Sequence, residues 1–93
     1  MKPKYGVAVT NQFKKDLKVA KKRKLDIDLL EAIVAKLANG EVLDPKFKDH
    51  ALTGNYRGYR ECHINPDWLL VYKVQNDILI LTLQRTGSHS DLF

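Results

Sequence analysis

Along the first part of the chain, the spacing of apolar residues changes from one typical of a strand to one typical of a helix. Residues 5–9 form a short apolar run, which predicts a strand. Thr10 or Asn11 offers an N-cap, and from there apolar residues recur on one helical face with lysines between them. The basic run at residues 22–24 ends that pattern. We therefore predict a first strand followed by an amphipathic helix.

A second helical pattern follows and then gives way to a long connection. Asp26 is a suitable N-cap, and Gly40 suits the C-terminal cap, so the two helices read as an αα-hairpin. The periodicity is lost over residues 41–55, which include Pro45 and His50. Connections longer than about 12 residues in compact domains are usually functional or disordered. We expect this loop to contribute to function.

The last part of the chain predicts an antiparallel meander. Apolar, β-branched and aromatic residues mark strands over residues 56–64, 68–74 and 78–85, joined by short turn sequences. A chain of 93 residues is expected to be one domain, because a smaller piece could not bury enough surface to fold unaided. The predicted fold class is α/β, an α+β sandwich with the order β-α-α-β-β-β, in a single domain covering residues 1–93.

Strand register predicts which side chains share a face. A turn about residues 76–77 places Val74 opposite Leu79 and Trp68 opposite Arg85, and a turn about residues 65–66 places His63 opposite Trp68. The predicted row is His63, Trp68 and Arg85, with Asp67 beside it. The opposite face, expected to pack against the helices, takes Cys62, Ile64, Leu69, Val71, Ile78 and Ile80. A slip of one residue would send a side chain to the other face.

Composition and charge narrow the class of protein. With 44% hydrophobic and 29% charged residues, the chain has the composition of a soluble globular protein. No apolar run approaches the roughly 20 residues that cross a bilayer, so we expect a cytoplasmic protein without a membrane partner. The first 24 residues hold nine Lys or Arg and a single Asp. This basic segment suits a polyanion, either nucleic acid or an acidic protein, or is simply a solvated helix face.

Cysteine and histidine spacing argues against a metal or another cofactor. Cys62 is the single cysteine, so an internal disulfide is impossible, in agreement with a reducing compartment. Cys62 and His63 are neighbours in a predicted strand and point to opposite faces, so they cannot share an ion. No CxxC or HxxxH spacing is present. We expect no metal site and no cofactor.

Histidine, aspartate and arginine together indicate acid–base chemistry on a phosphate. Each histidine alone reads as an ordinary loop, strand or tail residue. Their joint occurrence with an arginine favours catalysis, because imidazole exchanges protons near neutral pH and guanidinium binds phosphate oxygens. Arg85 could equally pair with Glu61 or Asp67. Phe93 suits stacking on a nucleobase.

Three sequence blocks resemble a known family. They are KDHALTG at residues 48–54, YRECHINPDWLLVYK at 59–73 and RTGSHSDLF at 85–93. Their order and spacing closely resemble the YafQ branch of the RelE/ParE superfamily of bacterial type II toxins. The similarity covers essentially the whole chain and is strongest from Lys46 onward. It implies a RelE-like fold, with an N-terminal strand, two helices and an antiparallel sheet.

The resemblance also implies a function. It indicates a ribosome-dependent endoribonuclease that cuts messenger RNA and is neutralised by a cognate antitoxin, with operator DNA bound only through the toxin–antitoxin complex. The expected catalytic residues are His50, His63, Asp67, Arg85 and His89. The expected RNA contacts are Trp68, Phe93 and Glu61, together with Lys14, Lys15, Lys18, Lys21 and Lys22, which we add from the basic helix.

We allocate the roles as follows. Arg85 stabilises the phosphate oxygens, Asp67 or His63 is the base, and His89 is the general acid. His50 assists or holds the phosphate, and Phe93 stacks. Two rivals remain open: a non-catalytic inhibitor of DNA gyrase on the same fold, as in the ParE branch, and a DNA-binding corepressor that acts only with its antitoxin.

Overall fold

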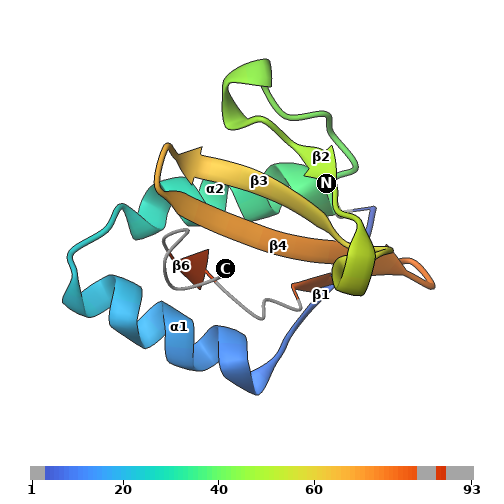
Figure 1. The fold of residues 1–93 in the computed structure, drawn as a ribbon. Coiled ribbons are helices and arrows are strands. Elements are labelled where there is room, and N and C mark those ends of the chain that lie inside the picture. The colour runs from blue at the N-terminus through green and yellow to red at the C-terminus, as the bar shows by residue number, and fades with distance from the viewer. Residues whose placement is uncertain (1–3, 82–85, 88–93) are drawn as a thin grey trace.

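The element order follows the sequence pattern closely. The structure, a computed structural model, describes residues 4–81 and 86–87. Figure 1 shows the helices α1 and α2 packed around the sheet, with α2 behind β3 and β4. The elements are β1 (Gly6–Val9), α1 (Asn11–Lys22), α2 (Ile27–Ala38), the 3₁₀ turn η1 (Pro45–Phe47), β2 (His50–Ala51), the 3₁₀ turn η2 (Gly54–Tyr56), β3 (Arg60–Asn65), β4 (Trp68–Gln75), β5 (Ile78–Leu81) and β6 (Thr86–Gly87).

The helix ends confirm the predicted caps. The Thr10 hydroxyl oxygen accepts a hydrogen bond from the backbone N–H of Phe13, and an Asp26 carboxylate oxygen accepts one from Leu29. Both bonds satisfy N–H groups that a helix start leaves without a partner. Gly40 follows α2 with φ +75°, a left-handed conformation that glycine adopts without steric cost. Among the described residues, no helix is long and apolar enough to cross a bilayer.

The connection between α2 and β3 is more ordered than its sequence predicts. It contains η1, β2 and η2. The short strand β2 pairs antiparallel with β3, which aligns His50 with Glu61. The strand predicted to begin at residue 56 begins instead at Arg60, because η2 occupies Gly54–Tyr56. This loop therefore brings His50 to the edge of the sheet.

The sheet has the strand order β1-β5-β4-β3-β2 in the described part of the chain. The short strand β6 pairs with β4 at Leu69 and Leu70, whereas β5 pairs with the other end of β4. The antiparallel meander of β3, β4 and β5 confirms the prediction. The parallel pairing of β1 with β5 was not anticipated, since nothing in a short apolar run indicates its partner. The last strand, predicted over residues 78–85, is described as β5 over Ile78–Leu81, and residues 82–85 of the prediction lie outside the described part.

The β4–β5 hairpin has the predicted turn but not the full predicted register. Asn76 and Asp77 take φ values of +52° and +61°, as a two-residue hairpin turn of this kind requires, and Val74 pairs with Leu79 as expected. Farther along β4, however, Leu70 pairs with Thr86 of β6. The register that placed Arg85 opposite Trp68 is therefore wrong, and Arg85 itself lies outside the described residues.

The β3–β4 hairpin also departs from the prediction. Its turn is centred on residues 66–67, so that Asn65 pairs with Trp68, and the register shifts between His63 and Asn65. With this turn an unbroken register would place His63 opposite Leu70, and the extra residue in β3 places it opposite Leu69, on the other face from Trp68. The predicted row of His63 and Trp68 is wrong for this reason.

This shift decides which side chains enter the core. Trp68, predicted to contact RNA, belongs to the core and is 2% exposed. Leu69 and Val71, predicted to face the helices, lie instead on the face that carries His63 and Glu61, because they pair with those residues. The main core cluster joins α1 and α2 to the sheet through Phe13, Leu30, Ile33, Cys62, Trp68, Leu70 and Leu79, among others.

Candidate functional site

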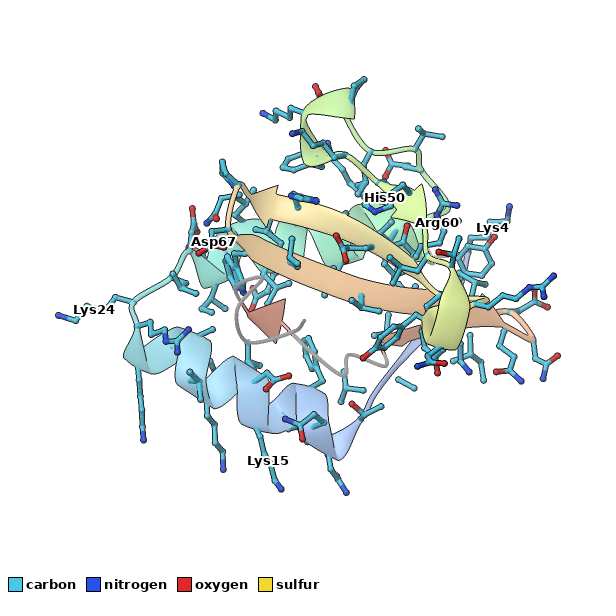
Figure 2. All side chains as sticks on the ribbon, viewed as in Figure 1. Lys4, Lys15, Lys24, His50, Arg60 and Asp67 are labelled. Atoms are coloured by element: carbon cyan, nitrogen blue, oxygen red, sulfur yellow. The ribbon has the colours of Figure 1, made fainter. Side chains whose placement is uncertain are left out.

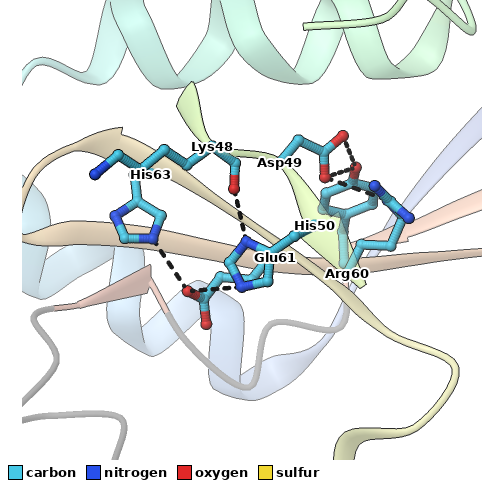
Figure 3. Close-up of polar contacts among 7 residues, drawn as sticks. Lys48, Asp49, His50, Arg60, Glu61 and His63 are labelled. Atoms are coloured by element: carbon cyan, nitrogen blue, oxygen red, sulfur yellow. Dashed lines mark hydrogen bonds and ion pairs between the residues drawn. The ribbon is translucent and has the colours of Figure 1, made fainter. Parts of the chain in front are cut away.

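Two imidazoles and one carboxylate meet on the sheet face opposite Cys62 and Trp68. The Nε2 atom of His63 lies 3.3 Å from Oε1 of Glu61, and Nε2 of His50 lies 3.8 Å from the same oxygen. The two imidazole ring centroids are 6.1 Å apart. Figure 3 shows the Glu61 carboxylate between the two rings. We call His50, Glu61 and His63 the imidazole cluster.

Strand geometry explains how the imidazole cluster forms. Glu61 and His63 are two residues apart in β3, so their side chains project from the same face. The pairing of β2 with β3 brings His50 directly opposite Glu61. Glu61 is 5% exposed, and a carboxylate this buried requires polar partners; Nε2 of His63, at 3.3 Å, is the nearer of the two imidazole nitrogens.

The backbone of Lys48 fixes the orientation of His50. The Nδ1 atom of His50 lies 2.7 Å from the Lys48 carbonyl oxygen. Because a carbonyl oxygen only accepts hydrogen bonds, Nδ1 must carry the hydrogen, and Nε2 of neutral His50 then carries a lone pair. Lys48 itself has φ +51°, a left-handed conformation that costs a non-glycine residue about 1–3 kcal/mol. The strained residue, Lys48, is therefore the one whose carbonyl group orients the His50 ring.

A second polar network anchors the residue before His50. The hydroxyl group of Tyr72 donates to the Asp49 carboxylate, at 2.8 Å from each oxygen, and Nε of Arg60 donates to Oδ1 at 3.2 Å. Burial, and then the bond to Asp49, raise the pKa of Tyr72 above its ordinary value, so the phenol stays protonated and remains a donor. Neither Asp49 nor Tyr72 is among the site residues predicted from the sequence.

The imidazole cluster supplies groups for two kinds of chemistry. Imidazoles held by a buried carboxylate can give and take protons, as in general acid–base catalysis. The same ligand atoms of His50, Glu61 and His63 all lie within 4.8 Å of one another, so they could also hold a metal ion such as Zn²⁺, which takes histidine nitrogen and carboxylate oxygen. Sequence spacing missed this ligand set because the β2–β3 pairing creates it.

The structure brings together only part of the predicted site. His50 and His63 meet, and Glu61, predicted as an RNA contact, lies between them. Asp67 is an exposed residue of the β3–β4 turn, whose backbone N–H donates to Asn65 Oδ1. Figure 2 places Asp67 at that turn, away from His50. The other predicted residues, Arg85, His89 and Phe93, lie outside the described part of the chain.

The predicted basic surface lies on α1. The lysines predicted to contact RNA are all exposed: Lys14, Lys15, Lys18, Lys21 and Lys22. Figure 2 shows Lys15 projecting from α1 away from the sheet and well separated from His50. These side chains therefore form a surface distinct from the imidazole cluster.

Comparison with known proteins agrees with the fold. The mRNA interferase toxin YafQ of Escherichia coli strain K12 is 39% identical over 88 residues, which are 94% of each chain. The E. coli DinJ–YafQ toxin–antitoxin complex contains a chain with 37% identity and a TM-score of 0.87, over 97% of this chain and 98% of that one. A metal-bound toxin from Helicobacter pylori has 43% identity and a TM-score of 0.88, over 96% and 99%.

The family match extends over almost the whole sequence. Residues 5–93 match a family described as the bacterial toxin of a type II toxin–antitoxin system, YafQ. That span includes the helices, the sheet and the imidazole cluster, so the match does not depend on one short motif. The chain therefore belongs to the YafQ family of bacterial type II toxins.

Proposed function

We propose that this toxin is an endoribonuclease that cleaves messenger RNA on the ribosome and is neutralised by a cognate antitoxin. The observation that carries the proposal is the imidazole cluster, in which His50 and His63 converge on the buried carboxylate of Glu61. The E. coli relatives are named mRNA interferases, and one of them is seen in complex with DinJ.

The proposed reaction proceeds by attack of the ribose 2′-hydroxyl on the adjacent phosphorus. A base removes the hydroxyl proton, the P–O5′ bond breaks, and an acid protonates the departing 5′-oxygen, which leaves a 2′,3′-cyclic phosphate. We assign the base to His50, because its Nδ1–H is donated to the Lys48 carbonyl and Nε2 holds the lone pair. Asp67 is the alternative base.

We assign Glu61 and His63 to the stabilisation of the negative charge that develops on the phosphate. The Glu61 carboxylate oxygen, 3.3 Å from His63 Nε2, holds the imidazole ring of His63 beside the position of the non-bridging oxygens. Arg85 and His89 retain their predicted roles as phosphate ligand and general acid, and Phe93 its role in stacking. No step of this mechanism requires a metal ion.

The lysines of α1 are assigned to ribosome binding. They are exposed and lie on a surface away from the imidazole cluster, so they can contact ribosomal RNA while the messenger enters the cluster. Phosphate contacts of this kind add affinity without base recognition.

The test is cleavage of a reporter message in a translation reaction. We expect His63→Ala, Arg85→Ala and His89→Ala each to lose most cleavage, while each variant still sediments with ribosomes. A message with a deoxynucleotide at the cut site should resist the wild-type toxin, because it lacks the attacking hydroxyl. Unchanged cleavage by His89→Ala or by Arg85→Ala would remove the corresponding role, and cleavage of the deoxy substrate would rule out the mechanism.

A further inference from the structure

A groove adjoins the imidazole cluster and is not used by the mechanism above. It has a volume of about 610 Å³, within the range of ligand-binding pockets. Its walls come from α2, η1, Lys48 and the β3–β4 turn. His63 lines this groove and also contacts Glu61, so the groove adjoins the imidazole cluster at this residue.

Both lysine side chains that line the groove are positively charged. Lys46 and Lys48 line it, and no carboxylate does so among the described residues. Phe47, which lies between the two lysines, is 9% exposed and anchors the segment in the core. The Lys46 ammonium group lies 5.2 Å from the centre of the Phe47 ring, a cation–π contact that keeps it near the protein surface. The two ammonium groups are thus attached to a fixed segment.

The remaining walls suit a nucleobase. Leu29, Ile64 and Pro66 provide apolar surface. The side-chain oxygen of Asn65 accepts from the Asp67 N–H, which orients the amide so that its NH₂ group is the donor left to face a ligand. Apolar walls, one amide donor and two cations match the parts of a nucleotide: a flat base, its hydrogen-bonding edge and its phosphates.

We propose that this groove binds the nucleotide adjacent to the scissile phosphate in single-stranded RNA. Lys46 and Lys48 contact its phosphates, the apolar wall takes the base, and Asn65 reads one base edge. The inference rests on the proposed function for the identity of the polymer. It adds a site that sets which nucleotide lies beside the cut.

The test measures binding of a 2′-O-methyl RNA trinucleotide, which cannot be cleaved because the attacking hydroxyl is blocked. Lys46→Gln and Lys48→Gly each remove one ammonium group, and glycine keeps the left-handed backbone at position 48. The matched control is Lys24→Gly, because Lys24 also has a left-handed backbone, with φ +58°, and does not line the groove.

We expect each groove variant to bind the trinucleotide several-fold more weakly, with a cooperative thermal transition no lower than that of the wild type confirming an intact fold. The slope of log affinity against log salt should fall by about 0.7 for each lysine removed. Lys24→Gly should change neither quantity. In a ¹H–¹⁵N titration of the wild-type toxin, the amide signals of Lys46, Lys48 and Asn65 should shift.

Cleavage by the wild-type toxin, measured in parallel, separates this inference from the proposed function. Unchanged binding in both lysine variants, or amide shifts confined to other parts of the chain, overturns the groove proposal even if the toxin cleaves messages. Groove-dependent binding by a toxin that cleaves nothing supports the groove and overturns the nuclease. Weakened antitoxin binding with unaltered RNA binding also overturns the groove proposal, since it assigns the groove to a protein partner.

Discussion

The hydroxyl group of Tyr72 lies 2.8 Å from both carboxylate oxygens of Asp49, the residue that immediately precedes His50. The contact joins the middle of β4 to the loop that enters β2. Because β2 is only His50–Ala51, its pairing with β3 contributes few hydrogen bonds of its own. The position of His50 therefore depends on this side-chain bond as well as on the sheet.

Replacing Tyr72 with Phe should lower both stability and activity. The change leaves the partly buried Asp49 carboxylate without its hydroxyl donor, which costs about 1–3 kcal/mol in the free energy of unfolding. We expect urea unfolding at a lower midpoint and slower message cleavage. Tyr5→Phe, on a half-buried ring in another part of the fold, is the control and should behave as wild type. A Tyr72→Phe toxin with wild-type stability would contradict this role for the bond.

Replacing Glu61 with Gln should impair cleavage while preserving the shape of the side chain. The amide carries no negative charge, so it weakens the contact with Nε2 of His63, which lies 3.3 Å away in the native protein. We expect cleavage to fall by about 100-fold, the lower range for loss of acid–base assistance. Glu31→Gln on the exposed surface of α2 is the matched control. A Glu61→Gln variant that cleaves as fast as this control would show that the carboxylate is only structural.

Because the thiol of Cys62 is buried, we expect the free energy of unfolding to decrease at alkaline pH. Burial, and then the charges of Asp49 and Glu61, raise the pKa of this thiol from 9.0 to about 12. Above pH 9 the unfolded chain releases the proton that the folded chain retains, so stability falls as pH rises from 9 towards 12. Tyr72 contributes in the same direction above pH 10.

The corresponding measurement is the thermal midpoint between pH 8 and pH 11. The wild-type midpoint should decline across this range, and Cys62→Ala should show a lower starting value but a shallower decline. The native thiol should also resist alkylation at pH 8, because only the thiolate reacts. Rapid alkylation of the folded protein would contradict the burial of Cys62.

Metal chelation should leave cleavage intact, because the proposed mechanism uses side chains alone. Added Zn²⁺ should instead inhibit, since coordination by His50, Glu61 and His63 would occupy the lone pairs that the reaction needs. Cleavage with and without EDTA, and over a series of Zn²⁺ concentrations, distinguishes these effects. Loss of activity in EDTA that Zn²⁺ restores would replace the acid–base mechanism with a metal-assisted one.

The elements and caps were predictable because they depend on neighbouring residues. The helix N-caps at Thr10 and Asp26 and the hairpin turn at residues 76–77 follow from local hydrogen bonding and backbone preference. The parallel pairing of Gly6 with Ile78 was not predictable in this way, because it joins strands that are remote in sequence and parallel pairing leaves no turn signature.

The site was only partly predictable for a similar reason. His50 and His63 could be selected by type, but their meeting depends on β2, a two-residue strand that follows from the β2–β3 pairing rather than from its own sequence. The irregularity between His63 and Asn65 moved Trp68 to the core, and a period-two pattern cannot reveal an inserted residue. Glu61 was predicted as an RNA contact, and its position two residues before His63 places the two side chains on one face of β3.

The pairing of β1 with β5 has a consequence during synthesis of the toxin. The strand at Gly6–Val9 leaves the ribosome early but has no partner in the sheet until Ile78–Leu81 has also emerged. Contacts between remote segments form late, since loop closure must precede them. The sheet of a nascent chain therefore stays open at β5 until residues 78–81 have left the ribosome, well after both helices have been made.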